Sequence, residues 1–240
     1  MIQLTKKGLT GRADIEFLQQ QFEREHSFRI CRLLDRDLLH TLIPRMDTLE
    51  WFTRDDGSIA REQSPTSATL AHAINFAVNT PEFLDVIRQI TKCEDILLFE
   101  GRLYRFAPGS EHFDTWHSDL GTSLRDRLVG MSINLGSLPY EGGVFRLRDK
   151  SSEMVISELV NTGQGDAIFF RISPKLQHMV TAVRGSQPKT AFAGWFRSGE
   201  TTFYETLRQT LSEGPGHESH GPSKAEILKG LNSNVPSQPD

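Results

Sequence analysis

Short β-rich runs, separated by glycine, proline, asparagine and serine, fill the chain from about residue 96 to residue 197. Runs of this length that are broken by turn-forming residues are typical of a sheet with tight turns. Seven such runs follow a helical leader, which indicates a mainly β fold with helices (α+β): a sandwich or jelly roll buttressed by N-terminal helices. Of the two, we predict the double-stranded β-helix, or jelly roll. The predicted strands are Ile96–Phe106, Arg127–Leu135, Val144–Arg148, Met154–Leu159, Ala167–Phe170, Met179–Val183 and Thr190–Arg197.

The first ninety residues are predicted to be helical, because apolar residues recur there at three- and four-residue spacing. The amphipathic runs are Ile15–Phe22, Leu38–Ile43 and Phe83–Ile90. The second run follows a candidate N-cap at Asp35, and the third follows Thr80-Pro81, a candidate cap with proline at the first helical position. We expect these helices to be structural.

A chain of 240 residues is long enough to bury one sizeable core. We expect a single domain over residues 1–213, with the helical leader at about 12–92 and the jelly-roll core at about 94–200. From Gly214 onward the chain is rich in Gly, Ser, Pro and Asn, which predicts a flexible tail over 214–240.

Charge and hydropathy exclude several classes of partner. The formal net charge is −4 at pH 7, so we expect no nucleic-acid partner, because nucleic-acid-binding domains usually carry a basic excess. No stretch approaches the roughly 18 apolar residues of a membrane span, and we expect a cytoplasmic protein without a membrane partner. Cys31 and Cys93 lie far apart without a CxxC motif, which argues against an iron–sulfur site or a disulfide scaffold. The oligomeric state is not indicated.

The motif that carries chemistry is Trp116-His117-Ser118-Asp119, with His178 about 60 residues later. Side chains at positions i and i+2 of an extended chain point to the same side, so His117 and Asp119 can reach one point in space. Two imidazoles and one carboxylate on one face of a metal are the ligand set of non-haem iron(II) oxygenases. We therefore predict His117, Asp119 and His178 as metal ligands and catalytic residues.

A second HxD triplet, His112-Phe113-Asp114, lies five residues upstream and competes with the first. We favour the later triplet for two reasons. A tryptophan precedes it, and the predicted strand Arg127–Leu135, which would form the next wall of the pocket, follows it closely. His112 and Asp114 are then expected in a loop or at the rim of the pocket.

The order of several segments resembles that of the iron(II)/2-oxoglutarate-dependent dioxygenase superfamily, in particular its prolyl-hydroxylase-like branch. The resemblance covers roughly residues 96 to 197. It implies an enzyme that uses Fe(II), O₂ and 2-oxoglutarate as co-substrate, with ascorbate as a candidate auxiliary reductant. The segments are a tyrosine-containing strand that leads through Ala107-Pro108-Gly109 into WHSD, then RLVGMSINLGSLPYEGGVFRLRD, GDAIFF, HMV and KTAFAGWFR.

The resemblance also implies a cation that pairs with the distal carboxylate of 2-oxoglutarate, six residues before a tryptophan. That position is Lys189, with Trp195 six residues on; Arg184 is the competing anchor, at a spacing that fits less well. Tyr104 and Asn134 match positions where relatives place residues against the co-substrate. Trp195 is expected to line the pocket, together with Phe145 and Val180.

The activity that the resemblance implies is hydroxylation of an unactivated C–H bond, coupled to decarboxylation of 2-oxoglutarate to succinate. Because relatives that halogenate replace the ligand carboxylate with a small residue, Asp119 favours hydroxylation, or desaturation, over halogenation. The expected substrate is an amino acid, peptide or protein. A small secondary metabolite is the alternative, as is a cupin-like metal-binding jelly roll without 2-oxoglutarate turnover. Arg146 and Arg148 are candidate contacts for an anionic substrate, although a solvated face explains them better.

Overall fold

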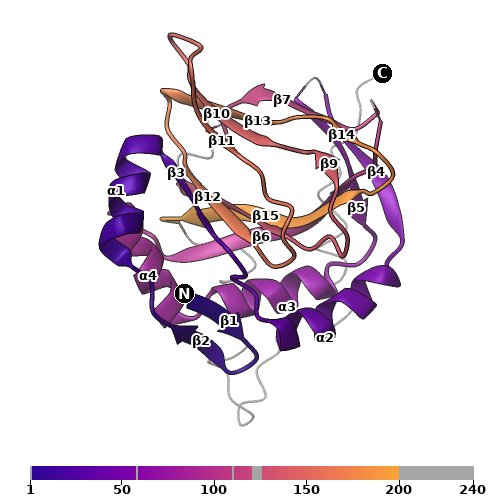
Figure 1. Cartoon of the computed structure of the whole chain (residues 1–240), viewed down its shortest axis with the longest axis horizontal. Coiled ribbons are helices and arrows are strands. Elements are labelled where there is room, and N and C mark those ends of the chain that lie inside the picture. The colour runs from indigo at the N-terminus through magenta and orange to yellow at the C-terminus, as the bar shows by residue number, and fades with distance from the viewer. Residues whose placement is uncertain (1, 58, 110, 121–125, 200–240) are drawn as a thin grey trace, which may run out of the picture. The chain divides into compact units, whose positions relative to one another are not determined.

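Antiparallel pairing links 11 strands of the computed structural model into one sheet that folds back on itself (Figure 1). The structure describes residues 2–57, 59–109, 111–120 and 126–199. In spatial order the strands are β11 (Val155–Leu159), β10 (Phe145–Asp149), β13 (Leu176–Val180), β7 (Phe113–His117), β5 (Ala60–Pro65), β6 (Leu98–Phe106), β15 (Lys189–Arg197), β8 (Arg127–Asn134), β12 (Ala167–Arg171) and β3 (Ser27–Ile30), with β4 (Trp51–Asp56) paired to β5. The predicted α+β jelly-roll class is confirmed, whereas the predicted tail over 214–240 lies outside the described residues.

Most predicted strands lie within two residues of the observed bounds. The exception is the predicted strand Met179–Val183, whose predicted bounds are wrong. Strand β13 begins at Leu176 and therefore includes His178, whereas Val183 belongs to a separate short strand, β14 (Val183–Arg184), paired with β9 (Glu141–Gly142). The chain leaves the main sheet at Thr181 and Ala182, so one apolar run is divided between two sheets.

The N-terminal helices are confirmed, and a further one is present. They are α1 (Ile15–Glu25), α2 (Arg36–Asp47), α3 (Thr69–Val78) and α4 (Pro81–Thr91). The Asp35 side chain caps α2 by accepting a hydrogen bond from the backbone N–H of Leu38 at 2.8 Å. Thr80 precedes α4 but makes no side-chain capping bond there.

The prediction that the first ninety residues are wholly helical is wrong. This region also contains the hairpin β1 (Ile2–Thr5) and β2 (Gly8–Gly11), together with β3, β4 and β5. Strand β3 pairs with β12, which follows it by well over one hundred residues, and the rings of Phe28 and Phe169 stack with centroids 4.6 Å apart. Distant partners of this kind override local periodicity.

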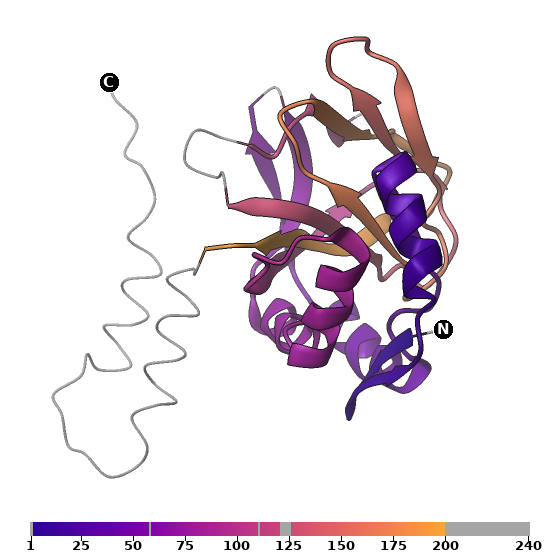
Figure 2. The same cartoon turned by 90° about the vertical axis from the view of Figure 1, so that its left-hand side faces the viewer.

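One layer of the folded sheet is formed by β6, β15, β8 and β12. One of its faces packs against the helices, and the other faces the inside of the folded sheet. Its outer face carries Phe99, Phe192 and Phe196, all fully buried in the core that the layer shares with the helices. Figures 1 and 2 show α2, α3 and α4 gathered on this side, whereas β10, β11 and β13 lie on the other. Because side chains alternate along a strand, Lys189, Ala193 and Trp195 of β15 point inward, toward the second layer. The helices therefore stiffen the wall of the inner space without entering it.

No helix among the residues that the structure describes is long and apolar enough to cross a membrane.

Candidate metal centre and co-substrate pocket

Strands β7 and β13 bring the predicted ligands together. They pair antiparallel, with the Cα atoms of His117 and His178 opposite one another. Asp119 lies two residues beyond the end of β7, where the chain continues along the same wall. Long-range pairing thus supplies the third ligand that the HxD motif needs.

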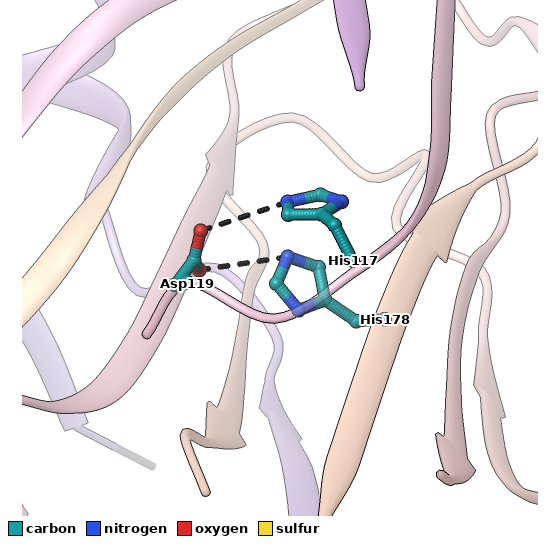
Figure 3. A group of neighbouring side chains, drawn as sticks. All are labelled: His117, Asp119 and His178. Atoms are coloured by element: carbon teal, nitrogen blue, oxygen red, sulfur yellow. Dashed lines mark ion pairs between the residues drawn. The ribbon is translucent and has the colours of Figure 1, made fainter. Parts of the chain in front are cut away.

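The side chains of His117, Asp119 and His178 converge on one point (Figure 3). One nitrogen or oxygen atom from each lies within 4.8 Å of the others. Asp119 Oδ1 is 3.6 Å from His117 Nε2, and Asp119 Oδ2 is 3.5 Å from His178 Nε2. Atoms bound about 2.1 Å from a single divalent ion are separated by about 3 to 3.5 Å, so the spacing fits one shared cation. The donor set matches the two-histidine, one-carboxylate triad of non-haem iron sites.

The orientation of His117 is fixed through its other ring nitrogen. Nδ1 lies 2.7 Å from the carbonyl oxygen of Thr115 and 3.1 Å from Oδ1 of Asp114, which leaves Nε2 turned toward Asp119. Burial lowers the pKa of His117, but the Asp114 and Asp119 carboxylates outweigh that effect and raise it to about 10. Neighbours of this kind set the tautomer and orientation of metal-binding histidines.

His178 is held by aromatic packing instead. Its ring centroid lies 4.6 Å from that of Phe170 and 5.8 Å from that of Phe145. Burial lowers the pKa of His178, which favours the neutral form that binds metals.

Asp119 accepts a hydrogen bond at Oδ2 from the indole Nε1 of Trp195, at 2.7 Å. Burial would raise the pKa of this carboxyl, but the two histidines and the indole keep it well below its usual range. Arg127 lies over the Trp195 ring, with its guanidinium carbon 3.4 Å from the ring centroid, and its Nη1 donates to the Asp119 backbone carbonyl oxygen at 3.3 Å. Asp119 is therefore held as an oriented carboxylate.

Lys189 lies in the same cavity and is 2% exposed. Its Nζ donates to the Gly143 carbonyl oxygen at 3.2 Å, and among the described residues it forms no salt bridge. Burial lowers its pKa to about 8, with the charge of Asp114 opposing the shift. Arg184, the competing anchor, is exposed on β14 and is not among the described residues that line the cavity.

The triad and Lys189 share a cavity of about 550 Å³. Phe145, Val180 and Trp195 line this cavity, as the sequence predicted, and Tyr104 lines it too. Asn134, predicted to contact the co-substrate, is not among the described residues that line the cavity. Its side-chain amide is hydrogen-bonded to the backbone instead. It donates to Gly163 O at 3.0 Å and accepts from Gly136 N at 3.1 Å.

Asp114, which was expected in a loop or at the rim of the pocket, lies in β7 and lines the cavity. Its contact with His117, three residues on, was not predicted. Several other charged residues of this cavity escaped the sequence analysis. Arg54 and Glu62 come from the β4–β5 hairpin, in a region predicted to be helical. Arg102 precedes Tyr104 by two residues, so strand alternation could have placed it on the same face.

Residues 101–197 match the family described as the 2OG-Fe(II) oxygenase superfamily. This match extends from within β6 to the end of β15. The matched segment contains all three converging ligands and Lys189. The chain is therefore a 2OG-Fe(II) oxygenase, an enzyme whose cofactors are Fe(II) and 2-oxoglutarate, as the sequence predicted.

Solved structures share the fold of this 2OG-Fe(II) oxygenase at low identity. An oxidoreductase of the 2OG-Fe(II) oxygenase family from Burkholderia pseudomallei is 14% identical, with a TM-score of 0.58 over 83% of this chain and 97% of that one. A Pseudomonas putida prolyl-4-hydroxylase is 20% identical, with a TM-score of 0.56 over 78% of this chain and 100% of that one. The alpha-ketoglutarate-dependent epimerase SnoN from nogalamycin biosynthesis is 15% identical, with a TM-score of 0.53 over 85% and 91%.

No curated protein matches this 2OG-Fe(II) oxygenase. The structural likenesses show the fold alone at these identities. They therefore leave the narrower prolyl-hydroxylase-like assignment a prediction.

Proposed function

We propose that this oxygenase hydroxylates an unactivated C–H bond of an amino-acid, peptide or protein substrate. The observation that carries the proposal is the convergence of two histidines and a carboxylate in one cavity with a buried ammonium that lacks a salt-bridge partner among the described residues. A buried charge without a counter-ion is costly, so a ligand that brings a carboxylate to Lys189 would relieve that cost.

Each residue has a distinct role in this proposal. His117, Asp119 and His178 would hold Fe(II), which when bound supplies O₂ activation coupled to decarboxylation of 2-oxoglutarate to succinate. Lys189 would pair with the distal carboxylate of 2-oxoglutarate, with Tyr104 packed beside it: Nζ lies 5.9 Å from the Tyr104 ring centroid. Trp195 would hold the Asp119 carboxylate in place through its indole N–H.

Two features bear on the outcome of the reaction and on its substrate. Asp119 keeps the third ligand position as a carboxylate, which favours hydroxylation or desaturation over halogenation. Similarity in fold to a prolyl-4-hydroxylase supports an amino-acid or peptide substrate, and similarity to SnoN supports the alternative of a small secondary metabolite. The family match does not favour the cupin-like alternative without 2-oxoglutarate turnover.

Anaerobic addition of Fe(II) and 2-oxoglutarate to the purified protein tests the cofactor assignment. A weak visible charge-transfer band is expected, because iron held by the triad would be chelated by the co-substrate. His117→Ala should abolish the band, whereas His112→Ala should keep it. His40→Ala, an exposed histidine in α2, controls for the loss of a histidine. A band that survives in His117→Ala would refute the ligand assignment.

A further inference from the structure

A cluster of three charged side chains lies in the same cavity as the metal ligands, but it belongs neither to the triad nor to the proposed Lys189 site. Glu62 of β5 is the centre of this cluster, and its side chain is only 6% exposed. Arg54 of β4 donates to Glu62 Oε1 through Nη1 at 3.2 Å, and Arg102 of β6 donates to the same oxygen through its own Nη1. The two arginine side chains are 43% and 41% exposed, respectively.

The register places this cluster on the inner face of the sheet. Arg102 lies opposite Ala193 of β15, and Tyr104, two residues along β6, lies opposite Ala191. Side chains two residues apart on a strand share a face, so Arg102 and Tyr104 both line the cavity. Arg54 and Glu62 reach the cavity from the β4–β5 hairpin, which forms part of its wall.

The cluster carries an excess of positive charge. Two guanidinium groups share one buried carboxylate, so one positive charge is uncompensated within the cluster. Asp56 also lines the cavity, but it is exposed, and water screens its charge. Each guanidinium uses one Nη1 atom, and its other N–H groups have no hydrogen-bond partner in the part of the chain that the structure describes. Buried Glu62 therefore holds two guanidinium groups at the cavity wall, each with further N–H groups that can donate to a ligand.

We propose that Arg54 and Arg102, oriented by Glu62, bind a free carboxylate of the substrate. This inference rests on the proposed function, because it assigns the substrate end of the same cavity. Guanidinium groups bind carboxylates through paired N–H donors, and this geometry is more specific than that of an ammonium. Arg146 and Arg148, the candidates from the sequence, do not serve: they contact Glu158 and Gln177, and neither is among the described residues that line the cavity.

The remaining lining indicates the body of the substrate. Ile59, Leu120 and Val180 contribute apolar surface to the same cavity. A fitting substrate therefore carries a carboxylate at one end and an apolar portion that reaches the metal centre. A free apolar amino acid, a peptide with an apolar C-terminal residue, and an apolar organic acid all present this chemistry.

Matched acids and amides test the inference. The enzyme is loaded with Mn(II) and 2-oxoglutarate and titrated calorimetrically with N-acetyl-leucine, 4-phenylbutyrate and a leucine-terminated tripeptide, each against its primary amide. We expect at least one acid to bind about tenfold or more tightly than its amide, a difference that corresponds to about 1.4 kcal/mol. Whether the organic acid, the amino acid or the peptide shows the larger difference identifies the source of the carboxylate.

Three variants locate the effect. Arg102→Gln and Arg54→Gln should each remove most of the preference for the acid, whereas Arg102→Lys should keep part of it. Arg146→Gln is the matched control, because Arg146 is also a strand arginine paired with a glutamate, with a side chain 40% exposed, but on β10 and outside the described cavity lining. No acid binding more tightly than its amide, or a preference that survives both glutamine variants, would overturn the inference.

The charge-transfer band separates this inference from the proposed function. Arg102→Gln and Arg54→Gln should retain the band with Fe(II) and 2-oxoglutarate, because neither residue belongs to the triad or to the Lys189 site. If the wild-type enzyme shows no band, the cofactor assignment fails. If the band is present and acids bind no better than amides, only the inference of a substrate-carboxylate site is refuted.

Discussion

The indole N–H of Trp195 is directed at Oδ2 of Asp119, the carboxylate oxygen that also lies 3.5 Å from His178 Nε2. A hydrogen bond between β15 and the segment that follows β7 therefore fixes the one acidic ligand of the candidate iron site. The predictions below all concern residues of β15, because this strand contributes both the indole and Lys189.

Trp195→Phe is expected to weaken Fe(II) binding about tenfold or more while the fold is kept. Loss of a hydrogen-bond partner outside the ligand set typically costs 10- to 100-fold in metal affinity. Phenylalanine keeps the packing surface beneath Arg127 but lacks the donor. Metal titration of the variant measures the effect, with Trp116→Phe as the control, since Trp116 stacks on Arg148 and is not among the described lining residues. Equal losses in both variants would contradict the role of the hydrogen bond.

Lys189→Ala is expected to abolish measurable 2-oxoglutarate binding while Fe(II) binding is retained, because Lys189 lies in the cavity but outside the triad. Titration of the charge-transfer band with 2-oxoglutarate measures the co-substrate affinity. Arg184→Ala is the control, because Arg184 was the competing anchor and lies exposed on β14. Unchanged co-substrate affinity in Lys189→Ala would instead favour the cupin-like alternative.

The affinity for 2-oxoglutarate is expected to fall as pH rises above about 8. Burial lowers the pKa of Lys189 to about 8, so the co-substrate-free pocket loses its positive charge above that pH. Below it the ammonium is present and affinity should be flat. Anaerobic titrations between pH 7 and pH 9 measure the slope. Lys189→Arg should bind independently of pH in this range, because arginine stays protonated; the same slope in that variant would assign it to another group.

In the co-substrate-free protein, removing the buried charge of Lys189 is expected to increase stability. The pKa of Lys189 is lowered from 10.5 to about 8. This shift means that the folded protein disfavours the charged form of Lys189 by about 3 kcal/mol relative to the unfolded chain. Because the unfolded chain binds the proton more tightly, this cost is fully present below pH 8 and disappears as pH rises toward 10.5. Lys189→Met should therefore raise the free energy of unfolding at pH 7, measured in urea, by roughly 1 to 3 kcal/mol. A destabilised variant would mean that Lys189 is satisfied by contacts other than the co-substrate.

Gly194→Ala is expected to destabilise the protein by about 2 to 4 kcal/mol. A Cβ at residue 194 would lie 2.0 Å from the carbonyl oxygen of Glu100, so the pairing of β15 with β6 would have to open. Urea unfolding measures the loss, with Thr53→Ala on the exposed side of β4 as the control. A wild-type midpoint in Gly194→Ala would show that the two strands can separate without cost.

The candidate ligands could be predicted because their signal is local in sequence. An HxD triplet needs only an extended backbone, and His178 immediately precedes the predicted strand Met179–Val183. That prediction missed that His178 lies within β13. The β4–β5 hairpin could not be predicted in the same way. Arg54 and Glu62 belong to strands with few apolar residues, whose pairing depends on each other and on β6 and β7. Arg54, one of the two residues proposed to bind the substrate carboxylate, was missed with this hairpin.

Asn134 shows the limit of transferring a role by position. Its place on β8 matches that of polar residues that contact the co-substrate in relatives, yet its amide bonds to the backbone at Gly136 and Gly163. Sequence alone does not show which partner a buried amide uses, because backbone and ligand groups offer it the same hydrogen bonds.

The metal ligands and Lys189 belong to opposite layers of the folded sheet, with β7 and β13 on one side and β15 on the other. A 2-oxoglutarate molecule held at both ends would act as a cross-brace between the layers, alongside the hydrogen bonds from Lys189 to Gly143 and from Trp195 to Asp119. Loading the co-substrate would then tighten the whole barrel around the reacting centre, and the two walls would be least firmly joined between one turnover and the next.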